Sequence, residues 1–130
     1  MPTYTRYDHT SHLAVLEAHG EVTRDEALAH FREVCTELED RSARDPDARY
    51  GVLLDTRHAA NVPTAADIVA VLDEMSRHGT ALPPSRWAVL ATEPAHYGMG
   101  RLFSMYAEGR GIELRVFDTS DSAIAWLHAE

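Results

Sequence analysis

A carboxylate, a guanidinium and an imidazole lie close together near the middle of the chain. Asp55, Arg57 and His58 follow directly after the apolar run Val52-Leu-Leu54. Carboxylate and imidazole side chains within hydrogen-bonding reach of a substrate can act as general acid and base. No serine or cysteine accompanies them in a nucleophile elbow or after a glycine turn, and the single cysteine, Cys35, falls on the buried side of an expected helix. We therefore expect no catalytic residues and a protein that is not an enzyme.

Histidines suggest a second chemistry, because imidazole is the commonest protein ligand of transition metals and the chain has eight of them. His58 and His96 each follow an expected parallel strand and could meet above the sheet, with Asp55 and Glu93 nearby. Solvated loop histidines are the simpler interpretation. We therefore predict no metal and no cofactor.

A third motif, Gly98-Met-Gly-Arg101, lies at the start of an expected helix and could at most form a weak anion-binding site. It lacks the lysine and the serine or threonine of a P-loop, and the third glycine of a dinucleotide site. Close packing of the helix on the sheet explains the two glycines more simply.

The elements that position these residues are organised around the apolar run at 52–54. An unbroken apolar strand buries both of its faces, as in the centre of a parallel sheet with helices above and below it. Because ligands and partners of open α/β sheets gather at the carboxyl ends of the strands, we expect any site just beyond Asp55. The pattern predicts strands at about 4–8, 12–19, 50–57, 87–91 and 112–117, a charged loop at 41–49 and an irregular segment at 58–63.

Four helices are expected between and after these strands. Thr23–Glu26 and Thr64–Asp67 have the spacing of capping boxes, and Gly79 is expected to end the second helix. The third helix is expected from 97 or 98 to 110, and the fourth after Thr119 or Ser120. Apolar residues recur at helical spacing in the first three helices: Leu28, Phe31, Val34, Cys35 and Leu38, then Ile68, Val71, Leu72 and Met75, then Met99, Leu102, Phe103 and Tyr106.

The connections determine the direction of the strands. A tight turn at Thr10 and Ser11 makes the first two strands antiparallel, whereas each later connection is long enough for a right-handed crossover between parallel strands. We predict an α/β fold in which a five-stranded, mixed but mostly parallel sheet packs with four helices. Residues 1–130 are expected to form a single domain.

Composition narrows the range of partners and compartments. Twenty-one acidic residues against twelve basic ones give a net charge of -9, which repels phosphate backbones and excludes the basic surface needed to bind nucleic acid. One cysteine permits no intrachain disulfide, which fits a reducing cytoplasm. The start of the chain lacks the apolar core of a secretory signal, and no stretch of eighteen apolar residues occurs, so we expect at most peripheral contact with membranes.

Several short motifs together resemble the SpoIIAA-like family, which belongs with the STAS domains of anti-sigma-factor antagonists. The resemblance also implies the fold of the lipid-carrying CRAL/TRIO domains. It specifies architecture better than activity, because none of the motifs is catalytic. They are Gly20-Glu-Val-Thr23, Gly51-Val-Leu-Leu-Asp55, Gly98-Met-Gly-Arg-Leu-Phe103, Val116-Phe117 and Ala123-Ile-Ala-Trp-Leu127.

The resemblance implies a phosphorylation site at one position. STAS-type antagonists present a phosphorylatable serine, in an Asp-Ser-Ser/Thr-Gly setting, where their second helix begins. Here the region reads Asn61-Val-Pro-Thr64, and Thr64 is the only hydroxyl at the matching place. An N-cap role that contributes about 1 kcal/mol is the favoured interpretation, and phosphorylation at the helix N-terminus is the alternative.

A ligand pocket between the second helix, the third helix and the sheet is a further hypothesis. It rests on the CRAL/TRIO relation and on the share of methionine and aromatic residues, which adapt to varied apolar guests; an ordinary filled core is the simpler alternative. The expected apolar lining is Val62, Met75, Met99, Phe103 and Tyr106, and the expected polar residues are Arg57, His58, Thr92, Tyr97 and Arg101.

Two functions remain open from the sequence. The first is a non-catalytic regulatory domain that presents a surface to a protein partner, including its own copy as a homodimer. The second is a carrier or sensor of a small apolar ligand or lipid with reversible membrane association, which requires a void of roughly several hundred cubic ångströms.

Overall fold

Strands and helices alternate along the chain as the apolar patterns predict. The computed structural model describes residues 3–8, 10–47, 49–78 and 86–129. The strands are β1 (Thr3–Asp8), β2 (Leu13–Gly20), β3 (Gly51–Ala59), β4 (Arg86–Leu90) and β5 (Glu113–Phe117). The helices are α1 (Arg24–Arg44), α2 (Ala65–Ser76), α3 (Pro94–Glu108) and α4 (Ser120–His128). The prediction of a five-stranded mixed sheet with four helices is confirmed.

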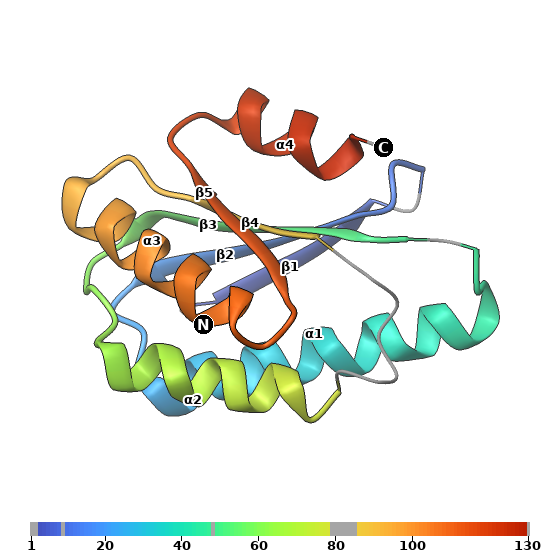
Figure 1. Cartoon of the computed structure of the whole chain (residues 1–130), viewed down its shortest axis with the longest axis horizontal. Coiled ribbons are helices and arrows are strands. Elements are labelled where there is room, and N and C mark those ends of the chain that lie inside the picture. The colour runs from blue at the N-terminus through green and yellow to red at the C-terminus, as the bar shows by residue number, and fades with distance from the viewer. Residues whose placement is uncertain (1–2, 9, 48, 79–85, 130) are drawn as a thin grey trace.

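The sheet has the simplest possible strand order, β1-β2-β3-β4-β5. β1 is antiparallel to β2, and every later pair is parallel. Because each crossover steps to the next strand in the same direction with the same hand, α1, α2 and α3 all lie on one face of the sheet. Among the described helices, α4 alone covers the other face (Figure 1).

β3 is buried on both sides, as its apolar run predicts. Val52 and Leu54 belong to the core beneath α1, α2 and α3, whereas Leu53 faces α4 together with Ala123 and Leu127. The exposed fractions of residues 52, 53 and 54 are 0%, 4% and 7%. The carboxyl end of this central strand is therefore held rigidly by two separate apolar layers.

Both predicted capping boxes are formed. The backbone N–H of Glu26 donates to Thr23 Oγ1 at 3.2 Å, and the backbone N–H of Thr23 donates to Glu26 Oε1 at 2.9 Å. The corresponding distances at Thr64 and Asp67 are 3.1 and 2.9 Å. α1 and α2 thus begin where the sequence predicts.

Some element boundaries differ from the prediction. α1 continues through Arg41 and Arg44, because basic side chains in a last turn interact favourably with the helix dipole. β3 continues to Ala59, because it pairs with the end of β2. α3 begins at Pro94, whose fixed φ and missing N–H suit the first turn of a helix. The expected end of α2 at Gly79 and the link at 82–85 lie outside the described residues, and α2 ends at Ser76.

α3 packs closely against β5 and β4. A Cβ atom placed on Gly100 would lie 2.6 Å from Val116 Cγ2 and 3.5 Å from Val89 Cγ1. The packing interpretation of this glycine is therefore correct. No helix within the described ranges is both long and apolar enough to cross a bilayer.

Candidate functional site

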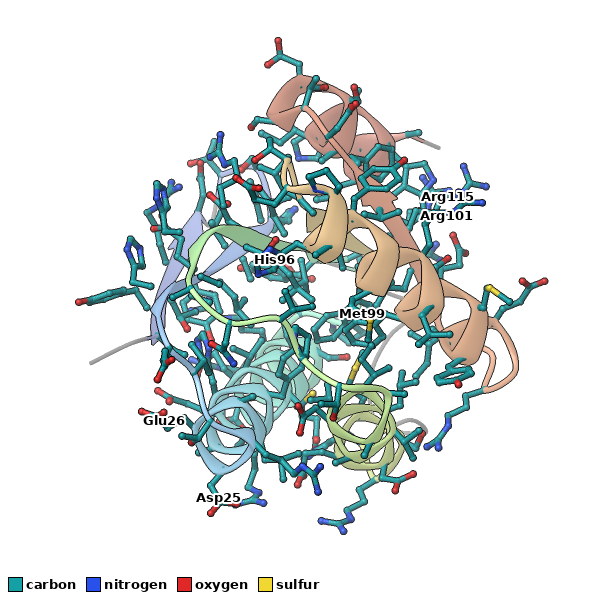
Figure 2. The ribbon with its side chains drawn as sticks, turned by 90° about the vertical axis from the view of Figure 1, so that its left-hand side faces the viewer. Asp25, Glu26, His96, Met99, Arg101 and Arg115 are labelled. Carbon is teal, nitrogen blue, oxygen red and sulfur yellow. The ribbon has the colours of Figure 1, made fainter. Side chains whose placement is uncertain are left out.

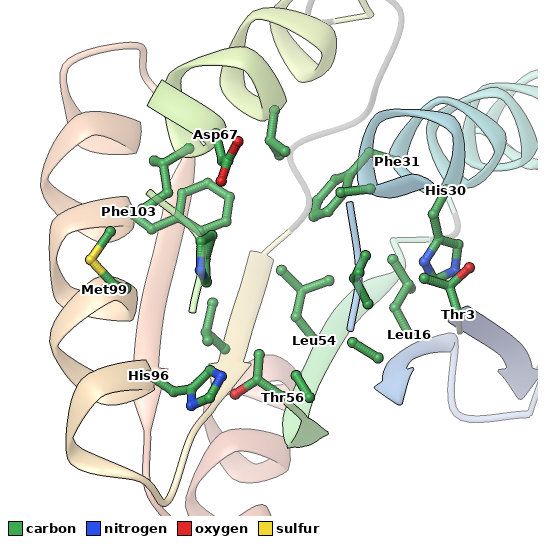
Figure 3. A pocket seen from close by; sticks show the side chains of 18 of the residues that line it. Thr3, Leu16, His30, Phe31, Leu54, Thr56, Asp67, His96, Met99 and Phe103 are labelled. Atoms are coloured by element: carbon green, nitrogen blue, oxygen red, sulfur yellow. The ribbon is translucent and has the colours of Figure 1, made fainter. Parts of the chain in front are cut away.

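A cavity of about 160 Å³ lies between the N-terminal parts of α1, α2 and α3 and the carboxyl ends of β2, β3 and β4 (Figure 3). The hairpin and the three crossovers bring these segments together, because parallel strands end at the same edge of the sheet. The walls are mostly apolar. They include Leu16, Ala27, Phe31, Leu54, Ile68, Val71, Val89, Met99 and Phe103.

Polar groups of the helix caps form one edge of the cavity. Thr23, Arg24 and Asp67 all contribute to the lining. The Nε–H of Arg24 donates to Asp67 Oδ1 at 2.7 Å, so an ion pair joins the N-terminal turns of α1 and α2. The two opposite charges thus offset each other at this edge of the cavity.

Two buried histidines also line the cavity, and each is 8% exposed. The Nε2 atom of His30 is hydrogen-bonded to Thr5 Oγ1, and burial lowers the pKa of His30 although the nearby Glu33 opposes that effect. The Nε2 atom of His96 lies 2.9 Å from the carbonyl oxygen of Asn61. The Asn61 side chain in turn bonds to the backbone of Val22 at 2.7 and 2.9 Å, which fixes the loop that receives the histidine.

The cavity overlaps only partly with the pocket expected from the sequence. Met99 and Phe103 line it, as predicted. Met75 is buried but belongs to the filled core, and Val62 and Tyr106 are 38% and 39% exposed. The remaining expected residues, Arg57, His58, Thr92, Tyr97 and Arg101, are not among its lining residues. Figure 2 shows Met99 on the inner side of α3 and Arg101 on its outer side.

The error on α3 has a simple geometric cause. Its buried face runs through His96, Gly100, Phe103 and Ala107, which are spaced four, three and four residues apart. The prediction from sequence relies on bulky residues to mark the buried face, and so it selects Tyr106 over the smaller Ala107 beside it. The same spacing could have identified His96, which was not predicted to line the pocket.

A second polar cluster lies at the carboxyl ends of β2 and β3. Glu17, Asp55 and His58 offer ligand atoms that all lie within 4.8 Å of one another. Between the Glu17–Asp55 and His19–His58 pairs, β3 has one residue more than β2, and this bulge brings His58 beside the two carboxylates. The rings of His19 and His58 stack with centroids 4.8 Å apart.

His58 therefore does not join His96, and that part of the metal hypothesis is wrong. Glu17, Asp55 and His58 are the one set among the described residues that could hold a divalent cation. Arg57 already binds both carboxylate oxygens of Asp55. Its Nη2–H donates to Oδ2 at 2.8 Å, and its Nε–H and backbone N–H each donate to Oδ1 at 3.0 Å. That no metal is bound stays a prediction.

The electrostatics of Asp55 do not suit a general base. Burial by itself raises the pKa of Asp55, but the hydrogen bonds and charge of Arg57 outweigh it and hold the pKa below the ordinary value. The carboxylate is thus a fixed anchor at the strand end, ionised at neutral pH. Cys35 is equally unsuited to chemistry, because burial raises the pKa of its thiol to about 12.

Thr64 is the N-cap of α2 and is exposed to solvent. Its N-cap role is observed, because Oγ1 accepts from the backbone N–H of Asp67. Phosphorylation of Thr64 stays a prediction.

Comparison with known proteins identifies the architecture. No model of a known protein family matches the sequence, and no curated protein is significantly similar to it. The structure is similar to an uncharacterised protein of the DUF3478 family from Shewanella loihica PV-4, described as having a SpoIIAA-like fold, with a TM-score of 0.61 and 15% identity over 96% of this chain and 91% of the other.

The structure is also similar to an anti-sigma factor antagonist from Mycobacterium paratuberculosis. The TM-score is 0.58 at 16% identity, over 98% of this chain and 93% of that protein. These two structures give no support to the CRAL/TRIO relation expected from the sequence. Their match over nearly the whole length, with the strand order and helix placement described above, assigns this chain the SpoIIAA-like fold.

Proposed function

We propose that the chain is a non-catalytic regulatory domain that binds a protein partner through the start of α2. The observation that carries this proposal is an exposed apolar surface around the N-cap Thr64. Val62 and Val69 are 38% and 39% exposed, and Ala65 and Ala66 between them are also exposed. Because residues three and four apart are neighbours on a helix, Val69 adjoins both alanines. We call Val62, Ala65, Ala66 and Val69 the α2 surface.

The fold neighbours support the class of function. An anti-sigma factor antagonist acts against another protein, an anti-sigma factor, and this chain has the fold of such an antagonist. By analogy with that neighbour, we propose that the partner of this chain is a protein of the anti-sigma factor type. At 16% identity the similarity supports a shared fold and nothing beyond it. The partner is therefore our proposal for this chain.

The charge of the domain restricts the partner further. The net charge is -9, and Glu21, Asp25 and Glu93 are exposed near the starts of α1 and α3, at the same end as the α2 surface. Figure 2 looks onto this end and shows Asp25 and Glu26 pointing outward. An apolar centre with an acidic rim is complementary to a partner whose binding surface is apolar in the middle and basic around it.

Variants of the α2 surface test the proposal. The double variant Val62→Glu, Val69→Glu places two charges in the apolar centre, so partner affinity should fall by at least tenfold. Met105→Glu is the matched control, because Met105 is 67% exposed but lies in the last turn of α3. The partner is first identified by affinity purification and mass spectrometry from the native cells, and binding is then measured by calorimetry with both purified proteins.

Thermal melting of each variant separates lost binding from lost folding. If the double variant is folded and binds with wild-type affinity, the α2 surface is not the contact and the proposal fails. If Met105→Glu weakens binding as much as the double variant, the contact lies elsewhere and the proposal fails as well. The homodimer expected from the sequence stays a prediction.

A further inference from the structure

The bulge in β3 places an imidazole beside two carboxylates. Glu17 pairs with Asp55 and His19 pairs with His58, so two steps along β2 correspond to three along β3. Because successive side chains of a regular strand point to opposite faces, His58 would lie on the other face from Asp55 without this extra residue. Bulges re-aim side chains in this way beside functional sites. The bulge thus assembles the set Glu17, Asp55 and His58, whose ligand atoms lie within 4.8 Å of one another.

Two of these side chains have acceptor atoms that no described protein group uses. Among the described residues none donates a hydrogen bond to Glu17, because the nearby Nε2 atom of His19 is 3.6 Å from Glu17 Oε1. The ring nitrogens of His58 also have no hydrogen-bond partner within the described ranges. The ring of His58 stacks on that of His19, with centroids 4.8 Å apart, and this contact leaves its nitrogens available.

Arg57 orients Asp55 without using all of its acceptor positions. Oδ1 of Asp55 accepts two hydrogen bonds from Arg57, and Oδ2 accepts one. An ionised carboxylate has about four acceptor positions, so one position on Oδ2 stays open. Carboxylates that bind metals are commonly held by hydrogen bonds from neighbouring residues, which fix their orientation. The pairing with Arg57 is therefore compatible with a metal ligand at Asp55.

The local charge favours a cation. Glu17 and Asp55 bring two negative charges within 4.8 Å, and the single guanidinium of Arg57 offsets only one of them. A divalent ion would remove the remaining repulsion between the carboxylates. The net charge of -9 also raises the concentration of cations near the protein. Because His58 is exposed and Glu17 is partly exposed, an ion can enter from solvent.

The donor types select a transition metal. Ca²⁺ and Mg²⁺ take oxygen ligands, whereas imidazole nitrogen suits ions such as Zn²⁺. At bond lengths of about 2.0–2.2 Å, the ligand atoms of a tetrahedral zinc site lie roughly 3.4 Å apart. The side chains of Glu17 and His58 reach solvent and can rotate to close the difference from their present separations. Three protein ligands leave the fourth position to water.

We propose that Glu17, Asp55 and His58 bind one divalent transition-metal ion, with Zn²⁺ as the probe, at the carboxyl ends of β2 and β3. This reverses the expectation drawn from the sequence, in which the bulge is not visible. The site uses none of the residues of the α2 surface. A failure of this proposal therefore leaves the proposed protein partner untouched, and the reverse also holds.

Calorimetric titration of untagged protein, freed of metal with a chelator, provides the first test. Wild type should bind one Zn²⁺ per chain with a dissociation constant of about 10 μM or lower, and Ca²⁺ at least roughly tenfold more weakly. Saturating Zn²⁺ should also raise the melting temperature, because the ligands are brought together only in the folded chain.

Substitution of the ligands locates the ion. His58→Gln and Glu17→Gln each remove one ligand at nearly constant size, so each should weaken Zn²⁺ binding at least about tenfold. His128→Gln and Glu108→Gln are the matched controls, because both residues are exposed at the ends of other elements, α4 and α3. Both controls should keep the wild-type affinity. In spectra of protein labelled with ¹⁵N at histidine, Zn²⁺ should shift the ring signals of His58 and leave those of His128 in place.

Thermal melting without metal confirms that each variant is folded. The proposal is overturned if wild type shows no saturable binding of Zn²⁺ below about 100 μM, or if Ca²⁺ binds as tightly as Zn²⁺. It is also overturned if the folded His58→Gln and Glu17→Gln variants bind as tightly as wild type, or if the controls lose as much affinity as they do.

Discussion

At the carboxyl end of β3, Asp55 and Arg57 show how a buried charge is kept ionised. The carboxylate of Asp55 is 5% exposed and would be destabilised by burial alone. Three N–H groups of Arg57 donate hydrogen bonds to this carboxylate, two from the side chain and one from the backbone. Charge-assisted hydrogen bonds of this kind are short and oriented, so they hold the end of the central strand in one geometry.

The variant Arg57→Met removes two of these hydrogen bonds together with the positive charge. The pKa of Asp55 should then rise, and the free energy of unfolding at pH 7 should fall by about 1–3 kcal/mol. Because Arg57 lowers the folded-state pKa, its contribution is complete above the unfolded-state pKa of about 3.9 and disappears as the pH falls through the lower folded-state value. The free energies of unfolding of wild type and variant should therefore become equal in acid. Urea unfolding of both proteins from pH 7 to pH 2.5 measures this.

Arg101→Met is the control for that experiment, because Arg101 is exposed on the outer side of α3. Its stability should stay within about 0.5 kcal/mol of wild type. An Arg57→Met variant as stable as wild type at pH 7, or one whose deficit grows in acid, would contradict the role assigned to the pair.

At the scale of the element, α3 shows that two glycines in one helix can have opposite roles. Gly100 faces β5, where a Cβ would lie 2.6 Å from Val116 Cγ2, whereas Gly98 is exposed, and a Cβ there would have no neighbouring atom within 4 Å. Only Gly100 is needed for close approach of the helix to the sheet. The wall of the cavity depends on that approach, because Gly100 is one of its lining residues.

Alanine at each position separates the two roles. Gly100→Ala should destabilise the protein by about 1–3 kcal/mol, because the added methyl overpacks the contact with β5. Gly98→Ala should stabilise it by roughly 0.5–1 kcal/mol, because alanine favours the helical backbone. Urea unfolding of both variants gives the comparison, and equal effects of the two substitutions would refute this account of α3.

At the scale of the whole molecule, charge repulsion is the dominant long-range effect. The net charge of -9 belongs to only 130 residues, and the ion pairs of the described surface, such as Arg110–Asp73, neutralise it only locally. Repulsion between charges of one sign opposes the folded state more than the unfolded one, because folding brings them closer.

Sodium chloride should therefore stabilise the protein. Raising the ionic strength from about 0.01 to 0.15 M shortens the Debye length from roughly 30 to 8 Å, so the melting temperature should increase by a few degrees at pH 8. Calorimetry over a salt series provides the measurement. A melting temperature that falls over the same range would mean that the surface ion pairs outweigh the net repulsion.

The elements of this fold were predictable because their signals are local. The capping boxes at Thr23–Glu26 and Thr64–Asp67 depend on side chains three residues apart, and the apolar run at 52–54 reports burial on both faces directly. The direction of the strands followed from the lengths of their connections. Each of these inferences needs only a short segment of the chain.

The cavity and the bulge were decided by tertiary structure. His96, Ala27 and Leu16 are far apart in the chain and meet only because three crossovers of the same hand bring the helix starts to one edge of the sheet. The position of His58 beside Glu17 depends on one extra residue in β3. This residue shifts the strand register by one position, and the hydrophobic pattern of the sequence gives no sign of the shift. The sequence by itself thus determined which segments form strands and helices, through local hydrogen bonds and burial. The space left between them was decided only when the side chains packed, because a void depends on the shapes of all its neighbours at once.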